Sequence, residues 1–306
     1  MFSASTDIWR YQFHPEVWII VISSVLLAFY ATRVVGPNAV KSNEPVITRK
    51  HKYAFVAAIV FLWFASDWPM HDISEEYLYS AHMLQHLIIS LVVPPLLLLA
   101  FPEWLGRLLL SPSGKTGAII QQLTRPVVAG FIYNFVIIVT HLPFTVNYSI
   151  ENGPFHYFIH LIVFVSSLWM WIPVMSPVPE LRRTYPAQMV YLFLMSVIPT
   201  VPAGFLTFAG GSLYDAYDHS VRLWGIGITT DQQLAGLVMK LIGGIYLWVW
   251  IATRFFQWSR RNRPEMSLVT ETTKPVEKVH SLNWPSSLIR QMNVQKICVN
   301  RGVERL

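Results

Sequence analysis

The sequence predicts an all-α protein built as a polytopic bundle of transmembrane helices, and two observations lead to this prediction. Hydrophobic residues make up 53% of the 306 residues and charged residues only 13%, against roughly 25% charged residues in soluble domains. The apolar residues also gather in segments long enough to cross a hydrocarbon core, which takes about 20 residues of helix. About seven segments fit, at residues 17–35, 53–68, 77–100, 126–142, 155–175, 187–208 and 233–256.

These segments divide the chain into three regions. We expect an extracytoplasmic N-terminus at residues 1–16, the helical bundle at 17–258, and a polar cytoplasmic tail, poorly ordered, at 259–306. The tail lacks a sustained apolar period. It holds the single cysteine, Cys298, so the sequence offers no intramolecular disulfide and no Cys-x-x-Cys metal site. Any metal chemistry must rest on histidine, methionine and carboxylate side chains.

Lysine and arginine residues lie mainly in alternate loops, and this pattern predicts the orientation. The loops after the first, third, fifth and seventh segments carry most of the bases, whereas the other loops are mainly acidic. By the positive-inside rule, the N-terminus lies outside and the C-terminus in the cytoplasm. The net charge of +6 therefore reflects topology, and we expect the lipid bilayer and no nucleic acid as a partner.

Histidines concentrate at the outer side of this topology. Eight of the ten histidines fall there, and in two places a pair is separated by four residues, so that both imidazoles lie on one face of a helix. Ionisable side chains at such a position are costly unless they bind a ligand or a partner, so they indicate a functional site. The candidate metal ligands are the five histidines at the outer ends of three consecutive helices: His82, His86, His141, His156 and His160.

The histidine spacing alone does not identify the metal. Imidazole suits copper, zinc, iron and nickel, whereas a thioether selects copper(I), and Met83 and Met70 are candidate soft ligands. A purely structural interpretation competes with the metal site. In it the paired histidines bond to loop carbonyls, His141 interacts with the end of its helix, and Asp231 caps the last helix.

Four motifs, in their order and intervals, carry a family resemblance. They are His-Met-Leu-Gln-His-Leu at 82–87 leading to Pro-Pro-Leu at 94–96, Thr-His-Leu-Pro at 140–143, Phe-His at 155–156 with His160, and Asp-Gln-Gln-Leu-Ala-Gly at 231–236. Over residues 16–258 the chain resembles the CtaG family of membrane proteins needed to assemble cytochrome c oxidase of the caa type. The resemblance implies a multi-pass protein of the plasma or inner membrane that works with cytochrome c oxidase subunits and handles copper.

Several classes of function compete for these residues. The favoured one is a copper-binding assembly factor that is not an enzyme and has no catalytic residues. A haem-binding electron-transfer protein, with histidines as axial ligands, is less favoured. A zinc-dependent enzyme needs a carboxylate near its ligands, and neither histidine pair has one between its members. A metal-free assembly scaffold is the remaining alternative.

Overall fold

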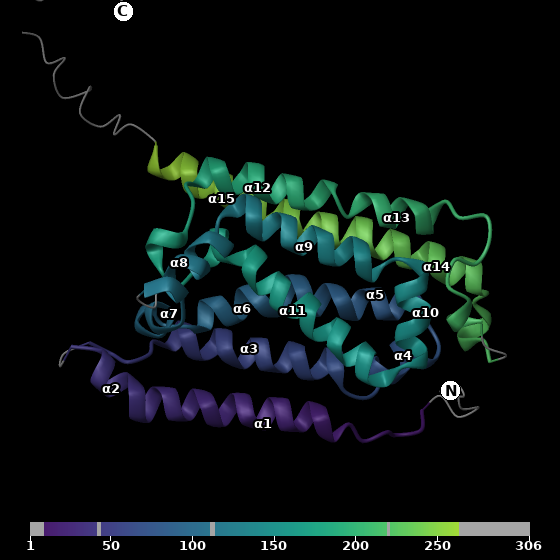
Figure 1. The fold of residues 1–306 in the computed structure, drawn as a ribbon, viewed down its shortest axis with the longest axis horizontal. Coiled ribbons are helices and arrows are strands. Elements are labelled where there is room, and N and C mark those ends of the chain that lie inside the picture. The colour runs from purple at the N-terminus through teal and green to yellow at the C-terminus, as the bar shows by residue number, and fades with distance from the viewer. Residues whose placement is uncertain (1–8, 42–43, 111–113, 219–220, 263–306) are drawn as a thin grey trace, which may run out of the picture. The chain divides into compact units, whose positions relative to one another are not determined.

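The computed structural model describes residues 9–41, 44–110, 114–218 and 221–262, and within these ranges the chain is helical and contains no strand (Figure 1). Six helices are long and apolar enough to cross a membrane, or seven if one bent pair is counted as a span. The predicted fold class is therefore confirmed. The chain divides into residues 1–260 and 261–306, and the fold is that of the first unit. His219, His280, Cys298 and most of the predicted tail lie outside the described residues.

The helices follow one another with short connections. The first half contains α1 (Pro15–Tyr30), η1 (Ala31–Val35), α2 (Gly36–Ala39), α3 (Arg49–Ser66), α4 (Met70–Glu76), α5 (Tyr79–Leu87), η2 (Ile88–Val92), α6 (Val93–Ala100), α7 (Glu103–Leu110), α8 (Gly114–Leu123) and α9 (Pro126–Thr140). The second half contains α10 (Pro143–Glu151), α11 (Gly153–Met175), η3 (Pro179–Leu181), α12 (Tyr185–Val197), α13 (Thr200–Thr207), η4 (Asp215–Tyr217), η5 (Leu223–Gly225), α14 (Ile228–Leu237), η6 (Val238–Ile242) and α15 (Gly243–Arg261).

Several of these elements join into longer helices. The π-helical segment η2 connects α5 to α6 in one 22-residue helix, and η6 connects α14 to α15 in the same way. Because π-turns insert an extra residue into a helix, they rotate the side chains that follow and occur frequently at functional sites. Both segments lie near the predicted histidine layer.

Two spans form the centre of the bundle. In the apolar window of the α5–α6 helix 61% of the residues are buried, and in that of α11 50%, against 6% for α1. Both spans contribute to a core cluster that includes Met170, Trp171, Leu192 and Tyr133. The Trp171 indole N–H donates to a carbonyl in η2 over 3.2 Å. The helices that carry the two histidine pairs are thus the most enclosed of the six candidate spans.

The structure differs from the predicted spans in two places. Residues 70–76, expected as an outer loop, form the short helix α4 directly after α3. The fourth predicted span is α9, whose 15 residues extend about 22 Å, short of the roughly 30 Å of a hydrocarbon core. It is bent by 69° from α8, and this bent pair is the reason for the count of six or seven.

The histidine pairs lie at one end of the bundle. The starts of α5 and α11 meet the end of α9 there, together with α4 and α10 (Figure 1). The basic start of α3, at Arg49, lies one helix length away from this end. The separation of histidines from basic loops thus agrees with the predicted topology, and the membrane side that each end faces stays a prediction.

Candidate metal centre

The helix that carries His82 and His86 is capped from a distance. The Asp231 carboxylate on α14 accepts hydrogen bonds from the Tyr79 amide (2.7 Å), the Ser80 amide (3.1 Å) and the Ser80 hydroxyl (2.5 Å). These amides belong to the first turn of α5, whose N–H groups have no partner within the helix. The expectation that Asp231 caps its own helix is wrong, because Gly227 occupies that position. The carboxylate instead fixes the start of α5.

Gln85, between the two histidines on α5, holds the neighbouring helices in place. Its amide donates to the Ala65 carbonyl of α3 over 2.8 Å and lies 3.1 Å from Nδ1 of His71 on α4. Its oxygen accepts from the Ser74 hydroxyl over 2.8 Å. Because Gln85 is almost completely buried, replacing it would leave several polar groups without partners. The hydrogen bonds of Gln85 therefore hold α4 against the face of α5 near the histidines.

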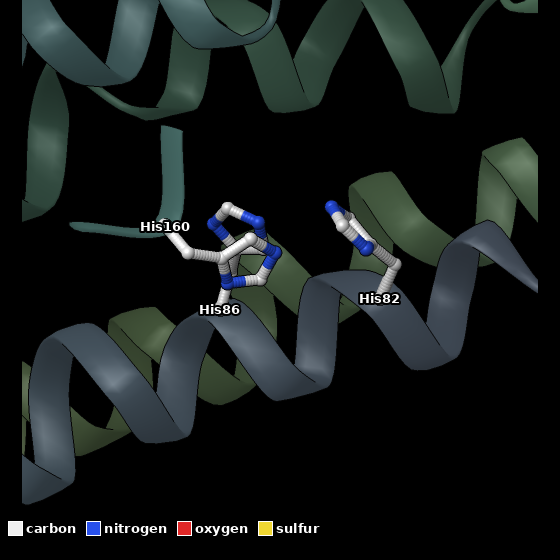
Figure 2. A group of neighbouring side chains, drawn as sticks. All are labelled: His82, His86 and His160. Atoms are coloured by element: carbon white, nitrogen blue, oxygen red, sulfur yellow. The ribbon is translucent and has the colours of Figure 1, made fainter. Parts of the chain in front are cut away.

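The four paired histidines converge, as Figure 2 shows for three of them. His82 and His86 project from the same face of α5, with ring centroids 4.4 Å apart, and the ring of His160 on α11 lies 4.7 Å from that of His86. His156 lies one turn before His160, and the two rings are tilted against each other with centroids 4.5 Å apart. One ligand atom from each of His82, His86 and His160 lies within 4.8 Å of the others. These three imidazoles form what we name the histidine cluster.

The ring nitrogens of this cluster have unmet bonding capacity. Nδ1 of His82, Nε2 of His86 and Nε2 of His160 are buried and have no hydrogen-bond partner among the described residues. Each such atom costs about 1–3 kcal/mol relative to water. Metal–imidazole bonds of about 2.0–2.1 Å place bound nitrogens up to about 4 Å apart, so small side-chain movements would bring one nitrogen from each of the three rings onto one ion. The residues present therefore fit a metal ion.

A carboxylate that the sequence analysis missed adjoins the cluster. Glu75 on α4 places Oε1 2.6 Å from Nε2 of His156 and 3.3 Å from Nδ1 of His71. The 2.6 Å contact lacks the alignment of a hydrogen bond, and Glu75, His156 and His160 form a second set of atoms within 4.8 Å of one another. His160 thus belongs to both sets. The spacing of Glu75, four residues after His71 on one helix face, is the signal that could have identified it.

His141 lies apart from these two sets. Its ring centroid is 6.5 Å from that of His86, the nearest histidine of the cluster. Its Nδ1 lies 2.7 Å from the Ile137 carbonyl at the end of α9, and its Nε2 lies 3.3 Å from Sδ of Met83. Of the five predicted ligands, the structure therefore brings four together and places the fifth next to a thioether.

A loop with two tyrosines covers the site. The Tyr214 hydroxyl donates to the His141 carbonyl (2.8 Å), and the Tyr217 hydroxyl donates to the Ser74 carbonyl (3.2 Å). Gln232 holds this loop by accepting from the Leu213 amide and donating to the Tyr214 carbonyl. Burial raises the pKa of Tyr214 to about 12, so this hydroxyl keeps its proton and remains a donor. The motif at 231–236 thus positions both α5 and the cover of the site.

The segment before α1 is attached to the same end of the bundle. His14 lies 2.7 Å from Oδ1 of Asp72 on α4, and its ring packs edge-on against His71 at 4.7 Å. The hydrogen bond to Asp72 raises the pKa of His14 above its usual value, against the opposing effect of burial. Protonated His14 therefore pairs with Asp72.

Fold and site together define a class: a multi-pass helical membrane protein with a buried cluster of histidines, able to hold a metal ion, at one end of its bundle. A family model described as cytochrome c oxidase caa3 assembly factor (Caa3_CtaG) matches residues 28–261. The chain belongs to this family, and the resemblance carried by the four motifs is confirmed. The comparisons found no matching curated protein and no matching solved structure.

Proposed function

We propose that this assembly factor binds copper at the histidine cluster and passes it to a cytochrome c oxidase subunit, without catalysing a reaction of its own. One observation carries the proposal: His82, His86 and His160, from two central helices, each bring a ring nitrogen within 4.8 Å of the others. Each of the three also has a buried ring nitrogen without a hydrogen-bond partner among the described residues. A histidine layer that served structure alone would be expected to bond to carbonyls, as His141 does. The family description supplies the oxidase as the destination.

The surroundings of the cluster favour copper over the other metals that imidazole binds. The sulfur of Met83 lies against His141 at the edge of the cluster, and thioether sulfur is a ligand for copper(I) and not for hard cations. The oxidases that this family serves belong to the haem–copper class, so copper is a metal that their assembly needs.

The shape of the site gives less support to haem or to an enzyme. The space between the histidines, bounded also by Tyr79 and Tyr217, has a volume of about 10 Å³. That is about the room that one water molecule needs, so a porphyrin would not enter without separating the helices. Glu75 is the one carboxylate at the histidine pairs among the described residues, and it lies against two imidazoles. This position supports a role as a ligand or as an orienting group.

Metal analysis and an absorption spectrum of the purified protein test the proposal. We expect close to one copper per chain after loading, no Soret band, and loss of the copper in a His82→Ala/His86→Ala double variant. His51→Ala is the matched control, because His51 lies at the start of α3, at the other end of the bundle. In cells, the double variant should fail to support assembly of the oxidase while the control supports it.

Two results would contradict the proposal. Wild-type protein that takes up no copper under copper-replete conditions would leave the histidine layer as structure and the protein as a scaffold. A Soret band that depends on His82 and His86 would identify a haem protein instead.

A further inference from the structure

Met83, a candidate soft ligand in the sequence, lies at the edge of the histidine cluster. It stands between His82 and Gln85 on α5, is almost completely buried, and directs its sulfur at Nε2 of His141, 3.3 Å away. A buried methionine usually fills space between apolar side chains. Here its sulfur instead faces the nitrogen of a side chain from another helix, α9, which ends beside α5.

The protonation of His141 follows from its other contact. Nδ1 lies 2.7 Å from the Ile137 carbonyl, and because a carbonyl oxygen only accepts, Nδ1 must carry the proton. In a neutral imidazole Nε2 then holds a lone pair. The thioether sulfur of Met83 has no proton either, so two lone pairs face each other across 3.3 Å. This arrangement is unfavourable when empty and suits a soft cation bound by both atoms.

The same two residues border two adjacent cavities. With His86 they line the small space inside the histidine layer, and they also line a second cavity of about 50 Å³ deeper in the bundle. The wall of the deeper cavity contains two further methionines, Met195 on α12 and Met239 in η6. Met83 and His141 therefore stand between an imidazole site and a cavity with thioethers in its wall.

We propose that Sδ of Met83 and Nε2 of His141 form a copper(I) subsite that exchanges copper with the histidine cluster through His86. This inference rests on the proposed function and specifies the ligand set and the oxidation state. The exchange is a substitution of ligands on an ion that stays copper(I), so no electron donor or acceptor is required. The deeper cavity is bordered by the π-helical segments η2 and η6 through Leu91 and Met239. It offers the ion space beyond this subsite.

X-ray absorption at the copper edge tests this subsite directly. The full-length protein, purified in detergent and loaded without oxygen with one equivalent of copper(I), should show a sulfur neighbour of copper beside nitrogen. Met83→Leu nearly conserves the side-chain volume and should remove the sulfur signal. In competition with a copper(I) chelator such as bicinchoninate, it should also weaken binding by at least about tenfold.

Two controls make the result specific. Met70→Leu changes a methionine on α4, outside the walls of both cavities, and should keep the sulfur signal. Selenomethionine labelling of the otherwise unaltered chain should place selenium next to copper, which shows without any substitution that the sulfur neighbour belongs to a methionine and not to Cys298.

The possible outcomes separate this inference from the proposed function. Copper surrounded only by nitrogen or oxygen, or a sulfur signal that survives in Met83→Leu, would overturn the subsite while leaving copper binding in place. Failure of the wild type to bind copper at all would overturn both proposals. A sulfur or selenium neighbour that disappears with Met83 alone would establish the subsite.

Discussion

Replacing Asp231 tests whether a carboxylate on one span holds the start of another. In Asp231→Ala the Tyr79 and Ser80 amides lose their acceptor, and so does the Ser80 hydroxyl. The loss of an ordinary N-cap costs about 0.5–2 kcal/mol, whereas a hydrogen bond to a charged group contributes about 1.5–3 kcal/mol. Since Asp231 is 3% exposed, water cannot fully replace it. We expect a loss of about 2–4 kcal/mol in the free energy of unfolding.

The assay is thermal unfolding of the purified protein in detergent. For a domain of this size, 1 kcal/mol corresponds to about 2–4 °C, so the apparent melting temperature should fall by roughly 5–15 °C. Asp231→Asn, which keeps one acceptor oxygen, should fall by less. Asp215→Asn is the control, because Asp215 is an exposed acid in the neighbouring loop, and its melting temperature should stay within about 2 °C of the wild type.

If Asp231→Ala has the same melting temperature as Asp215→Asn, the Asp231 carboxylate does not stabilise α5, and the start of that helix must be held by its packing alone. If Asp231→Ala is destabilised but keeps its copper, the cap supports the fold and the histidines find their geometry without it.

Two further variants test packing and pH dependence. A Cβ on Gly236 would lie 2.6 Å from the Ala203 carbonyl oxygen, so Gly236→Ala should lower the free energy of unfolding by about 1–3 kcal/mol, measured by thermal unfolding. Gly244 has open space around it, so Gly244→Ala is the control and should leave the melting temperature unchanged or slightly higher. Because Asp72 raises the pKa of His14, the pair stabilises the fold fully below about pH 6.5 and less as the pH rises through the raised pKa. The difference in melting temperature between the wild type and His14→Ala should therefore be larger at about pH 6 than at about pH 9; a constant or growing difference would contradict this assignment.

The sequence was sufficient for those features that depend on neighbouring residues. Apolar segments of 15 to 25 residues predict the spans because a bilayer leaves few alternatives, and the four-residue spacing of His82 and His86 places both on one helix face. The orientation rule also placed both histidine pairs at one end of the bundle. Each of these predictions uses contacts within a helix or a single topological rule.

The features of the site that the sequence did not predict depend on contacts between residues far apart in the chain. Asp231 lies at a helix start in the sequence, and local rules assign it to that helix, whereas the packing of α14 on α5 directs it 151 residues back. Glu75 was assigned to an acidic outer loop because residues 69–76, between the second and third predicted spans, are mostly polar. Only the arrangement of α4 against α5 and α11 brings that carboxylate to His156.

The charge at this site points to the oxidation state of the metal it would carry. The imidazoles of His82, His86 and His160 are neutral ligands, and Glu75 is the one carboxylate in contact with the paired histidines among the described residues. With Glu75 ionised, copper(I) makes the group neutral, whereas a divalent ion leaves one net positive charge. Burying an uncompensated charge costs several kcal/mol even after relaxation. The balance of charge therefore supports the proposed monovalent state of the ion, and the thioether of Met83 supports it independently.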